Sequence, residues 1–254
     1  MSTLFTGISE LRTVSERGTL NDAAIIAQSG TIAWVGPASE APAADEKVDL
    51  GGRAVLPGWV DSHTHMVFDG DRSAEFEARI SGGSYEAGGI AVTMDATRQA
   101  GTDRLDKLVA DRVAAGRRGG TTTFETKTGY GLNTESEVEA AKVASRHVDD
   151  VTFLGAHLVP PGADAEEYLD EVVGPMLEGV APYVQWIDVF CERGAFNEEQ
   201  SRRVLEAGKK LGLGLRVHGN QLGEGPGVAL AVELGAASVD HVNHLTDEDV
   251  ELLA

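Results

Sequence analysis

LPGWVDSHTH, residues 56–65, is typical of a buried strand that ends in two histidines. Successive side chains of a strand point to opposite faces, so His63 and His65 would point to the same side, about 7 Å apart along the strand. Two neutral imidazoles on one face can share a metal ion of the zinc type. Because an HxH triplet is common in proteins, its meaning depends on the partners that the rest of the chain supplies.

Composition narrows the class of protein. The 254 residues are 42% hydrophobic and 24% charged, which suits a soluble globular protein with a sizeable core. The 21 Lys and Arg against 41 Asp and Glu give a net charge of −20, which argues against nucleic acids and anionic membranes as partners. No run of about 18 apolar residues predicts a membrane span. The single cysteine, Cys191, and the lack of a secretory signal pattern favour a cytoplasmic location.

The pattern of apolar residues divides the chain in two. Residues 1–56 predict a small N-terminal β domain, with strands near 23–27, 31–35 and 48–55. From residue 57 to 254, strands alternate with helices, which implies a parallel sheet and an α/β fold. The strands are expected at residues 57–65, 121–125, 151–157, 185–192, 213–218 and 237–241. The helices are expected at 103–118, from 134 onward, at 197–211 and at 226–234, with a capping box at Thr134 and Glu137.

Each expected strand of the second part ends in a polar group. These groups are His63 with His65, Glu125 with Lys127, His157, Glu192, His218, and Asp240 with His241. In a barrel of parallel strands the C-terminal strand ends form one face, and that face carries the active site. The convergence of histidines on this face therefore predicts a catalytic or metal site there.

A hydrolytic site with one metal ion needs about three protein ligands and one open position for water. His63, His65 and His218 could supply the three ligands. A bound cation lowers the pKa of its water toward neutral pH, and a nearby base can then accept the proton. His241 is the best candidate for that base, because an imidazole titrates near the working pH. We assign no role to Glu125, Lys127, Glu192 or His244.

At these residues the chain resembles the amidohydrolase superfamily, whose HxH motif on the first barrel strand is matched by His63 and His65. Six segments resemble the imidazolonepropionase family within it, and they occur in the family's order over nearly the whole chain. They are LPGWVDSHTHMVFDGDR (56–72), FETKTGYGL (124–132), TFLGAHLVP (152–160), IDVFCE (187–192), VHGNQ (217–221) and SVDH (238–241).

The resemblance implies a metal-dependent cyclic amidohydrolase that hydrolyses 4-imidazolone-5-propanoate to N-formimidoyl-L-glutamate in histidine degradation. It implies one zinc or iron ion per subunit, a small-molecule substrate and a homodimer. The metal ligands would be His63, His65 and His218. Arg72 would pair with the substrate carboxylate, for which a guanidinium is well shaped. The other substrate contacts would be Tyr85, Tyr130, His157 and Gln221. His241 would transfer the proton, and Gln221, an amide where some relatives have an acid, could only orient groups in the reaction.

One departure from the family concerns the length of the chain. The family's remaining metal ligand is an aspartate at the end of the eighth barrel strand. Residues 57–254 number 254 − 57 + 1 = 198, short of the roughly 250 of a full barrel. We therefore expect a C-terminally truncated fragment: a (β/α)₈ TIM-like barrel of the amidohydrolase type with about six of its eight βα units, and a small, partial N-terminal β-sandwich portion.

Three alternatives stay open. The first is another amidohydrolase with one metal ion, such as a heterocycle deaminase, which would not need Arg72 for a substrate carboxylate. The second is a two-metal hydrolase, which is less favoured because the fourth barrel strand ends in Glu192 and offers no bridging lysine. The third is an inactive fragment, or a remnant that only binds metal.

Overall fold

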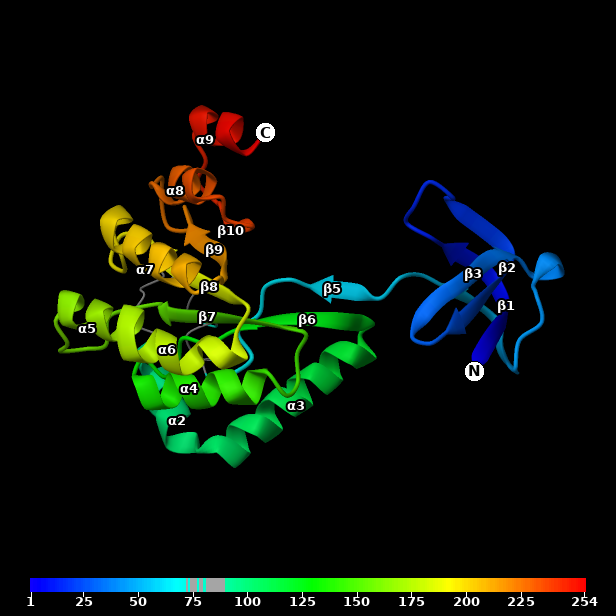
Figure 1. Cartoon of the computed structure of the whole chain (residues 1–254), viewed down its shortest axis with the longest axis horizontal. Coiled ribbons are helices and arrows are strands. Elements are labelled where there is room, and N and C mark those ends of the chain that lie inside the picture. Colours follow the sequence, from blue (N-terminus) through cyan, green and yellow to red (C-terminus); the bar gives the residue numbers. More distant parts are fainter. Residues whose placement is uncertain (72, 74–76, 78–79, 81–89) are drawn as a thin grey trace. The chain divides into compact units, whose positions relative to one another are not determined.

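The structure is a computed structural model that describes residues 1–71, 73, 77, 80 and 90–254 (Figure 1). It divides into two compact units, Met1–Trp59 and Val60–Ala254, which we call the first and the second unit. The domain boundary that the sequence predicts between residues 56 and 57 stays a prediction. Arg72 and Tyr85 lie outside the described residues, so the structure gives no position for either.

The first unit is a small β-sheet. Its strands are β1 (Ser2–Arg12), β2 (Thr19–Gln28), β3 (Thr31–Pro37) and β4 (Glu46–Val55), with a short 3₁₀ turn, η1 (Ala38–Glu40), after β3. The order in the sheet is β3-β2-β1-β4, with β1 parallel to β4 and the other neighbours antiparallel. Ile8, Leu11 and Ala23 form the centre of its core. Ser29 and Gly30 both have positive φ, as the tight turn between β2 and β3 requires.

Strand β1 was not among the strands predicted from the sequence. Its pairing with β2 shifts register between Phe5 and Ile8, around Gly7, which has a φ of 64°. A bulge of this kind breaks the alternation of apolar and polar residues, which is the signal that identifies a strand.

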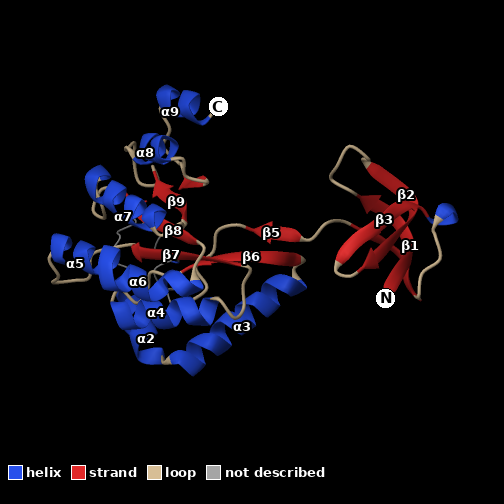
Figure 2. Ribbon diagram, viewed as in Figure 1, coloured by secondary structure: helices blue, strands red, loops and turns tan. Residues whose placement is uncertain are grey.

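The second unit confirms the predicted α/β fold class, with six strands among its described residues (Figure 2). They are β5 (Trp59–Asp61), β6 (Thr121–Lys127), β7 (Asp150–Ala156), β8 (Trp186–Cys191), β9 (Gly214–Gly219) and β10 (Ser238–His241). The strands follow one another in sequence order, and the ladders from β6 to β10 are parallel. This is the order of successive units in a (β/α) barrel.

Helices connect the strands of the second unit. They are α2 (Ile90–Ala100), α3 (Thr102–Arg118), α4 (Thr134–Ala144), α5 (Ala165–Glu171), α6 (Leu177–Val180), α7 (Glu198–Lys210), α8 (Gly227–Leu234) and α9 (Asp247–Leu253), with a π-turn η3 (Val172–Met176) and a 3₁₀ turn η4 (Ala181–Tyr183) beside α6. Helices α3, α4, α7 and α8 contact β6, β7, β8 and β9 in turn. Among the described helices none combines the length and apolar character needed to cross a membrane.

Two local predictions are wrong. Residues 56–65 do not form a buried strand: β5 has only three residues, and Trp59 and Val60 are 60% and 66% exposed, because β5 is an edge strand of the described sheet. The capping box at Thr134 and Glu137 is also absent. Asn133 caps α4 by accepting from the backbone N–H of Ser136. Asn197 caps α7, and its side chain accepts from the backbone N–H of Gln200.

Helix α7 lies close to the sheet at Gly208. A Cβ atom placed at Gly208 would overlap Cγ2 of Ile187, which is fully buried on β8. Because residue 208 has no side chain, α7 can lie this close to β8.

We predict that Gly208→Ala lowers the free energy of unfolding by about 1–3 kcal/mol, because the added methyl group forces α7 away from β8. The higher helix propensity of alanine opposes this loss without cancelling it. Urea unfolding measures the effect. Lys210→Ala, at an exposed site of the same helix, should change the free energy by less than about 0.5 kcal/mol. Equal stabilities of the two variants would show that the packing argument is wrong.

Candidate metal centre

The segment that carries His63 and His65 follows β5 and is hydrogen-bonded to β6. The hydroxyl of Thr64 donates to the carbonyl of Glu125 (2.6 Å), and its backbone N–H donates to Oε2 of the same residue (3.1 Å). The carbonyl of Thr64 accepts from the N–H of Lys127 (2.9 Å). With Thr64 held against β6, the side chains on either side of it point the other way, as the alternation of an extended chain requires.

His218, in β9, brings a third imidazole to these two. The ring centroids of His63 and His218 are 4.7 Å apart, those of His63 and His65 5.3 Å, and those of His65 and His218 5.5 Å. One ring nitrogen of each residue lies within 4.8 Å of the others. Two nitrogens that share one zinc ion lie at most about 4.2 Å apart, so small side-chain rotations would suffice. The structure thus brings together the three residues predicted as metal ligands.

The donor atoms fit a metal ion. Nδ1 of His65 and both ring nitrogens of His218 are buried, and none of the three makes an aligned hydrogen bond to the described residues. Nδ1 of His218 lies 2.9 Å from the Asp188 carboxylate, and Nδ1 of His63 lies 3.0 Å from that of Asp240. A proton on each Nδ1 is favoured by these carboxylates, which leaves the lone pair of Nε2 for an ion. This is the arrangement around metal-binding histidines in general.

His65 stays neutral in this cluster. Burial lowers its pKa well below the usual value for histidine, and the neighbouring His218 and His157 lower it further. A neutral imidazole is the form that binds a metal ion.

Tyr130 and His157 line one side of the histidine cluster. The His157 ring stacks on that of His65, with centroids 5.7 Å apart, and the Tyr130 ring lies edge-on to it at 5.8 Å. Nδ1 of His157 is 2.9 Å from the carbonyl of Gly129. Both residues therefore lie beside His65, and their predicted contacts with a substrate stay predictions.

His241 lies at the end of β10 in a strained backbone conformation. Its φ is 76°, a value that residues other than glycine rarely adopt, and the φ of Val242 is 45°. Its ring lies 5.2 Å from that of His63 and 5.1 Å from that of His218. His241 is exposed as a whole, but partial loss of solvent around its ring lowers its pKa to about 4, helped by these two histidines. The predicted proton-transfer residue thus borders the ligand cluster.

Gln221 follows β9 in a loop that Glu192 organises. One oxygen of the Glu192 carboxylate accepts from the backbone N–H of Gln221 (2.8 Å) and of Leu222 (3.0 Å). Glu192 is therefore a structural residue of the loop next to His218, a role that the sequence left unassigned. The predicted catalytic and substrate contacts of Gln221 stay predictions.

Two other histidines lie away from this cluster. His244 is exposed, and its backbone N–H donates to the carbonyl of Asn220 (3.0 Å). His147 follows α4, and its Nε2 lies 3.1 Å from the carboxylate of Asp106.

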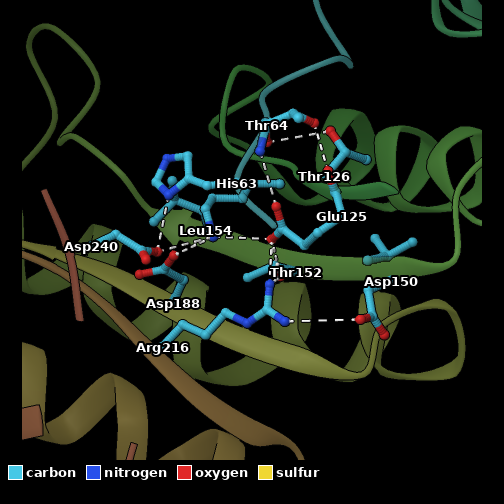
Figure 3. A network of polar contacts seen from close by, with 12 residues as sticks. His63, Thr64, Glu125, Thr126, Asp150, Thr152, Leu154, Asp188, Arg216 and Asp240 are labelled. Carbon is cyan, nitrogen blue, oxygen red and sulfur yellow. Dashed lines mark hydrogen bonds and ion pairs between the residues drawn. The ribbon is translucent and has the colours of Figure 1, made fainter. Parts of the chain in front are cut away.

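Three charged residues beneath the histidines have roles that the sequence did not predict, although it named Lys127 and Asp240 as polar groups at strand ends. Asp188 comes from the middle of β8 and Asp240 from β10 (Figure 3). In the sheet, Asp240 lies opposite His218 of β9. The third is Lys127, whose side chain is fully buried. A charged residue inside an otherwise apolar strand could have indicated such a cluster, because a buried charge almost always has a partner. Asp188, within Trp186–Cys191, is the clearest example.

Asp188, His218 and Asp240 form a second group of possible metal ligands. The ammonium of Lys127 already lies 3.0 Å from Asp188 and 3.6 Å from Asp240. A lysine cation therefore stands beside the carboxylates that a second metal ion would need, which favours the three histidines as the metal centre.

Glu137 holds the loop that carries Tyr130. Its buried carboxylate accepts from the backbone N–H of Gly129 (2.9 Å), Gly131 (2.7 Å) and Leu132 (2.9 Å). Burial raises its pKa, and these hydrogen bonds oppose the rise. Glu137 therefore shapes the loop and also holds Gly129, the residue whose carbonyl faces His157.

Comparisons with known proteins agree with this geometry. No model of a protein family matches the chain. The chain is 64% identical over its full length to an imidazolonepropionase of Arthrobacter sp. (strain FB24) and spans 64% of that protein. It is 53% identical, again over its full length, to an imidazolonepropionase of Streptomyces coelicolor and spans 67% of it. The chain belongs to the imidazolonepropionase family. It spans between 62% and 66% of the length of the first four relatives.

Solved structures support the fold of this chain. An amidohydrolase matches 100% of the chain with a TM-score of 0.66 and 17% identity, and the match covers 64% of that protein. A guanine deaminase from C. acetobutylicum matches 100% of the chain with a TM-score of 0.64 and 14% identity, covering 65% of that protein. At such identities the likeness extends to the fold alone.

We predict that Glu137→Gln destabilises the loop at residues 128–132, because an amide NH₂ would face a backbone N–H that now finds an acceptor. The free energy of unfolding should fall by about 1–3 kcal/mol. Hydrogen exchange at Gly129, Gly131 and Leu132 should accelerate at the same time. Glu135→Gln, an exposed substitution in the same helical turn, is the control. Unchanged exchange at the three amides would contradict the assigned role of Glu137.

Proposed function

We propose that the protein hydrolyses the cyclic amide C–N bond of 4-imidazolone-5-propanoate to give N-formimidoyl-L-glutamate, a step of histidine degradation. The observation that carries the proposal is the cluster of His63, His65 and His218, with carboxylates behind two of the rings. The cluster occurs in a chain that is 64% identical to a protein named imidazolonepropionase. Family membership selects this substrate among those that amidohydrolases could use.

The three histidines would hold one zinc or iron ion per subunit, because neutral imidazoles suit both metals. When bound, the ion lowers the pKa of water and polarises a carbonyl group. In the reaction the carbonyl carbon of the ring gains the water oxygen, the neighbouring ring C–N bond breaks, and the ring nitrogen takes up the water proton.

The chain's own residues would move the proton and hold the substrate. His241 would accept the proton and deliver it to the leaving nitrogen, since its ring borders both His63 and His218. His157 and Tyr130 would contact the substrate ring from the side of His65.

The rest of the substrate site is assigned by family membership alone. Arg72 would bind the propanoate carboxylate, and Tyr85 and Gln221 would add further contacts. The homodimer and the cytoplasmic location stay predictions.

We predict that His218→Ala removes most of the bound metal and lowers turnover by about 1000-fold or more, since a metal ion contributes several kcal/mol to such a reaction. Metal analysis of the purified protein and loss of substrate absorbance measure the two effects. His147→Ala, at a histidine that faces Asp106 instead of the cluster, should retain both metal and activity. Full activity and metal content in His218→Ala would refute the proposed site.

We also predict that the protein opens the imidazolone ring without releasing ammonia. Product analysis after incubation with 4-imidazolone-5-propanoate should show N-formimidoyl-L-glutamate in an amount equal to the substrate consumed. Guanine and cytosine serve as controls with exocyclic amines. Ammonia release from either control, with the imidazolone left intact, would point to a deaminase instead.

A further inference from the structure

The side chain of Lys127 lies beneath the three histidines proposed as metal ligands, and its ion pairs are with carboxylates. Its side chain is fully buried, and its Nζ lies 3.0 Å from Glu125, 3.0 Å from Asp188 and 3.6 Å from Asp240. The side chains of Glu125 and Asp188 are 2% exposed or less, and that of Asp240 is 18% exposed. One ammonium group therefore faces three carboxylates in the interior of the second unit.

Two of these carboxylates are the ones that face the ligand histidines. The oxygen of Asp188 nearest to Lys127, Oδ2, is also the atom 2.9 Å from Nδ1 of His218. Oδ2 of Asp240 is likewise shared between Lys127 and Nδ1 of His63. Two chains of contacts thus run from one ammonium group to two of the three proposed metal ligands. Figure 3 shows the contact between His63 and Asp240.

The third carboxylate has a cation of its own. Glu125 lies 2.8 Å from the guanidinium of Arg216 and also accepts from the hydroxyl of Thr152. This leaves Lys127 as the cation shared by Asp188 and Asp240 among the described residues. The residues come from β6, β8 and β10, so they alternate along the sheet, as the members of one layer inside a barrel do.

The shared cation offsets the repulsion between the carboxylates of Asp188 and Asp240, whose oxygens lie within 4.8 Å of each other. Without the ammonium group of Lys127 the two carboxylates would move apart, and each would leave the imidazole nitrogen that it faces.

We propose that Lys127 is a positioning residue of the metal centre: its ammonium group holds the carboxylates of Asp188 and Asp240 in place, so that the oxygens they share with it stay beside Nδ1 of His218 and Nδ1 of His63. The proposal rests on the proposed function, since it takes these histidines as metal ligands. Lys127 acts on the ion only through the two aspartates and the two imidazole rings. Its effect should therefore appear first in the tautomers of the histidines, even when no metal is bound.

The first test measures the tautomers of His63 and His218 in the metal-free protein by ¹⁵N NMR of the imidazole rings. In the unaltered protein both rings should carry the proton on Nδ1. In Lys127→Met both should become mixtures of the two tautomers, while His147 keeps its own state. Lys142→Met, which removes a lysine paired with Glu139 on the surface of α4, should leave His63 and His218 unchanged.

The second test measures Zn²⁺ affinity by competition with a chromophoric chelator. Lys127→Met should weaken binding by about 10- to 100-fold, the loss found when an outer partner of a metal ligand is removed. Lys142→Met should bind as tightly as the unaltered protein. If Lys127→Met does not fold, Lys127→Gln removes the charge and keeps a hydrogen-bond donor, and Asp240→Asn tests the link to His63 separately.

The outcomes separate the two ideas. A protein that binds no Zn²⁺ but shows the expected change of tautomers refutes the proposed function and leaves the role of Lys127 standing. Tautomers of His63 and His218 that do not respond to Lys127→Met or Lys127→Gln overturn the positioning role, whatever happens to metal affinity. A loss of affinity with unchanged tautomers would show that Lys127 serves packing alone.

Discussion

The ion pairs around Lys127 are the constraint on which the second unit is built. A barrel interior is usually filled with apolar side chains, yet here Glu125, Asp188 and Lys127 are buried together. Each charge would be costly alone, and removing one partner of such a group leaves the others unpaired. Strands β6, β8 and β10 must therefore keep their register for the charges to meet. The same register sets the histidines above them.

The hydrogen bonds around Thr64 connect this polar layer to the proposed metal centre. Thr64 bonds to Glu125 and Lys127 through its hydroxyl and its backbone, so the residues that build the ion cluster also fix the HxH segment. His63 and His65 owe their common direction to this attachment and to the alternation of an extended chain. The three-residue strand β5 before them contributes little, since its side chains are exposed.

The sequence was sufficient for the features that depend on local pattern. The strands that end in His157, His218 and His241 were predicted, because apolar runs bounded by turn residues identify strands, and parallel strands place their ends together. Features that depend on contacts between distant residues were not. Asn133 caps α4 in place of Thr134, because the Glu137 carboxylate accepts hydrogen bonds from the loop that carries Tyr130. The pairing of Asp240 with His63 likewise depends on which strands are neighbours.

The buried charges are better explained by a function than by a contribution to stability. Ion pairs in a protein interior contribute little net stability, and apolar residues of similar size often serve the fold as well. If packing were the only purpose of Lys127, Glu125 and Asp188, apolar residues at all three positions could serve the fold as well. What apolar residues cannot do is hold a proton on one chosen nitrogen of an imidazole. His218 and His63 would need this as metal ligands, and the carboxylates that face them, Asp188 and Asp240, both lie against the same ammonium group.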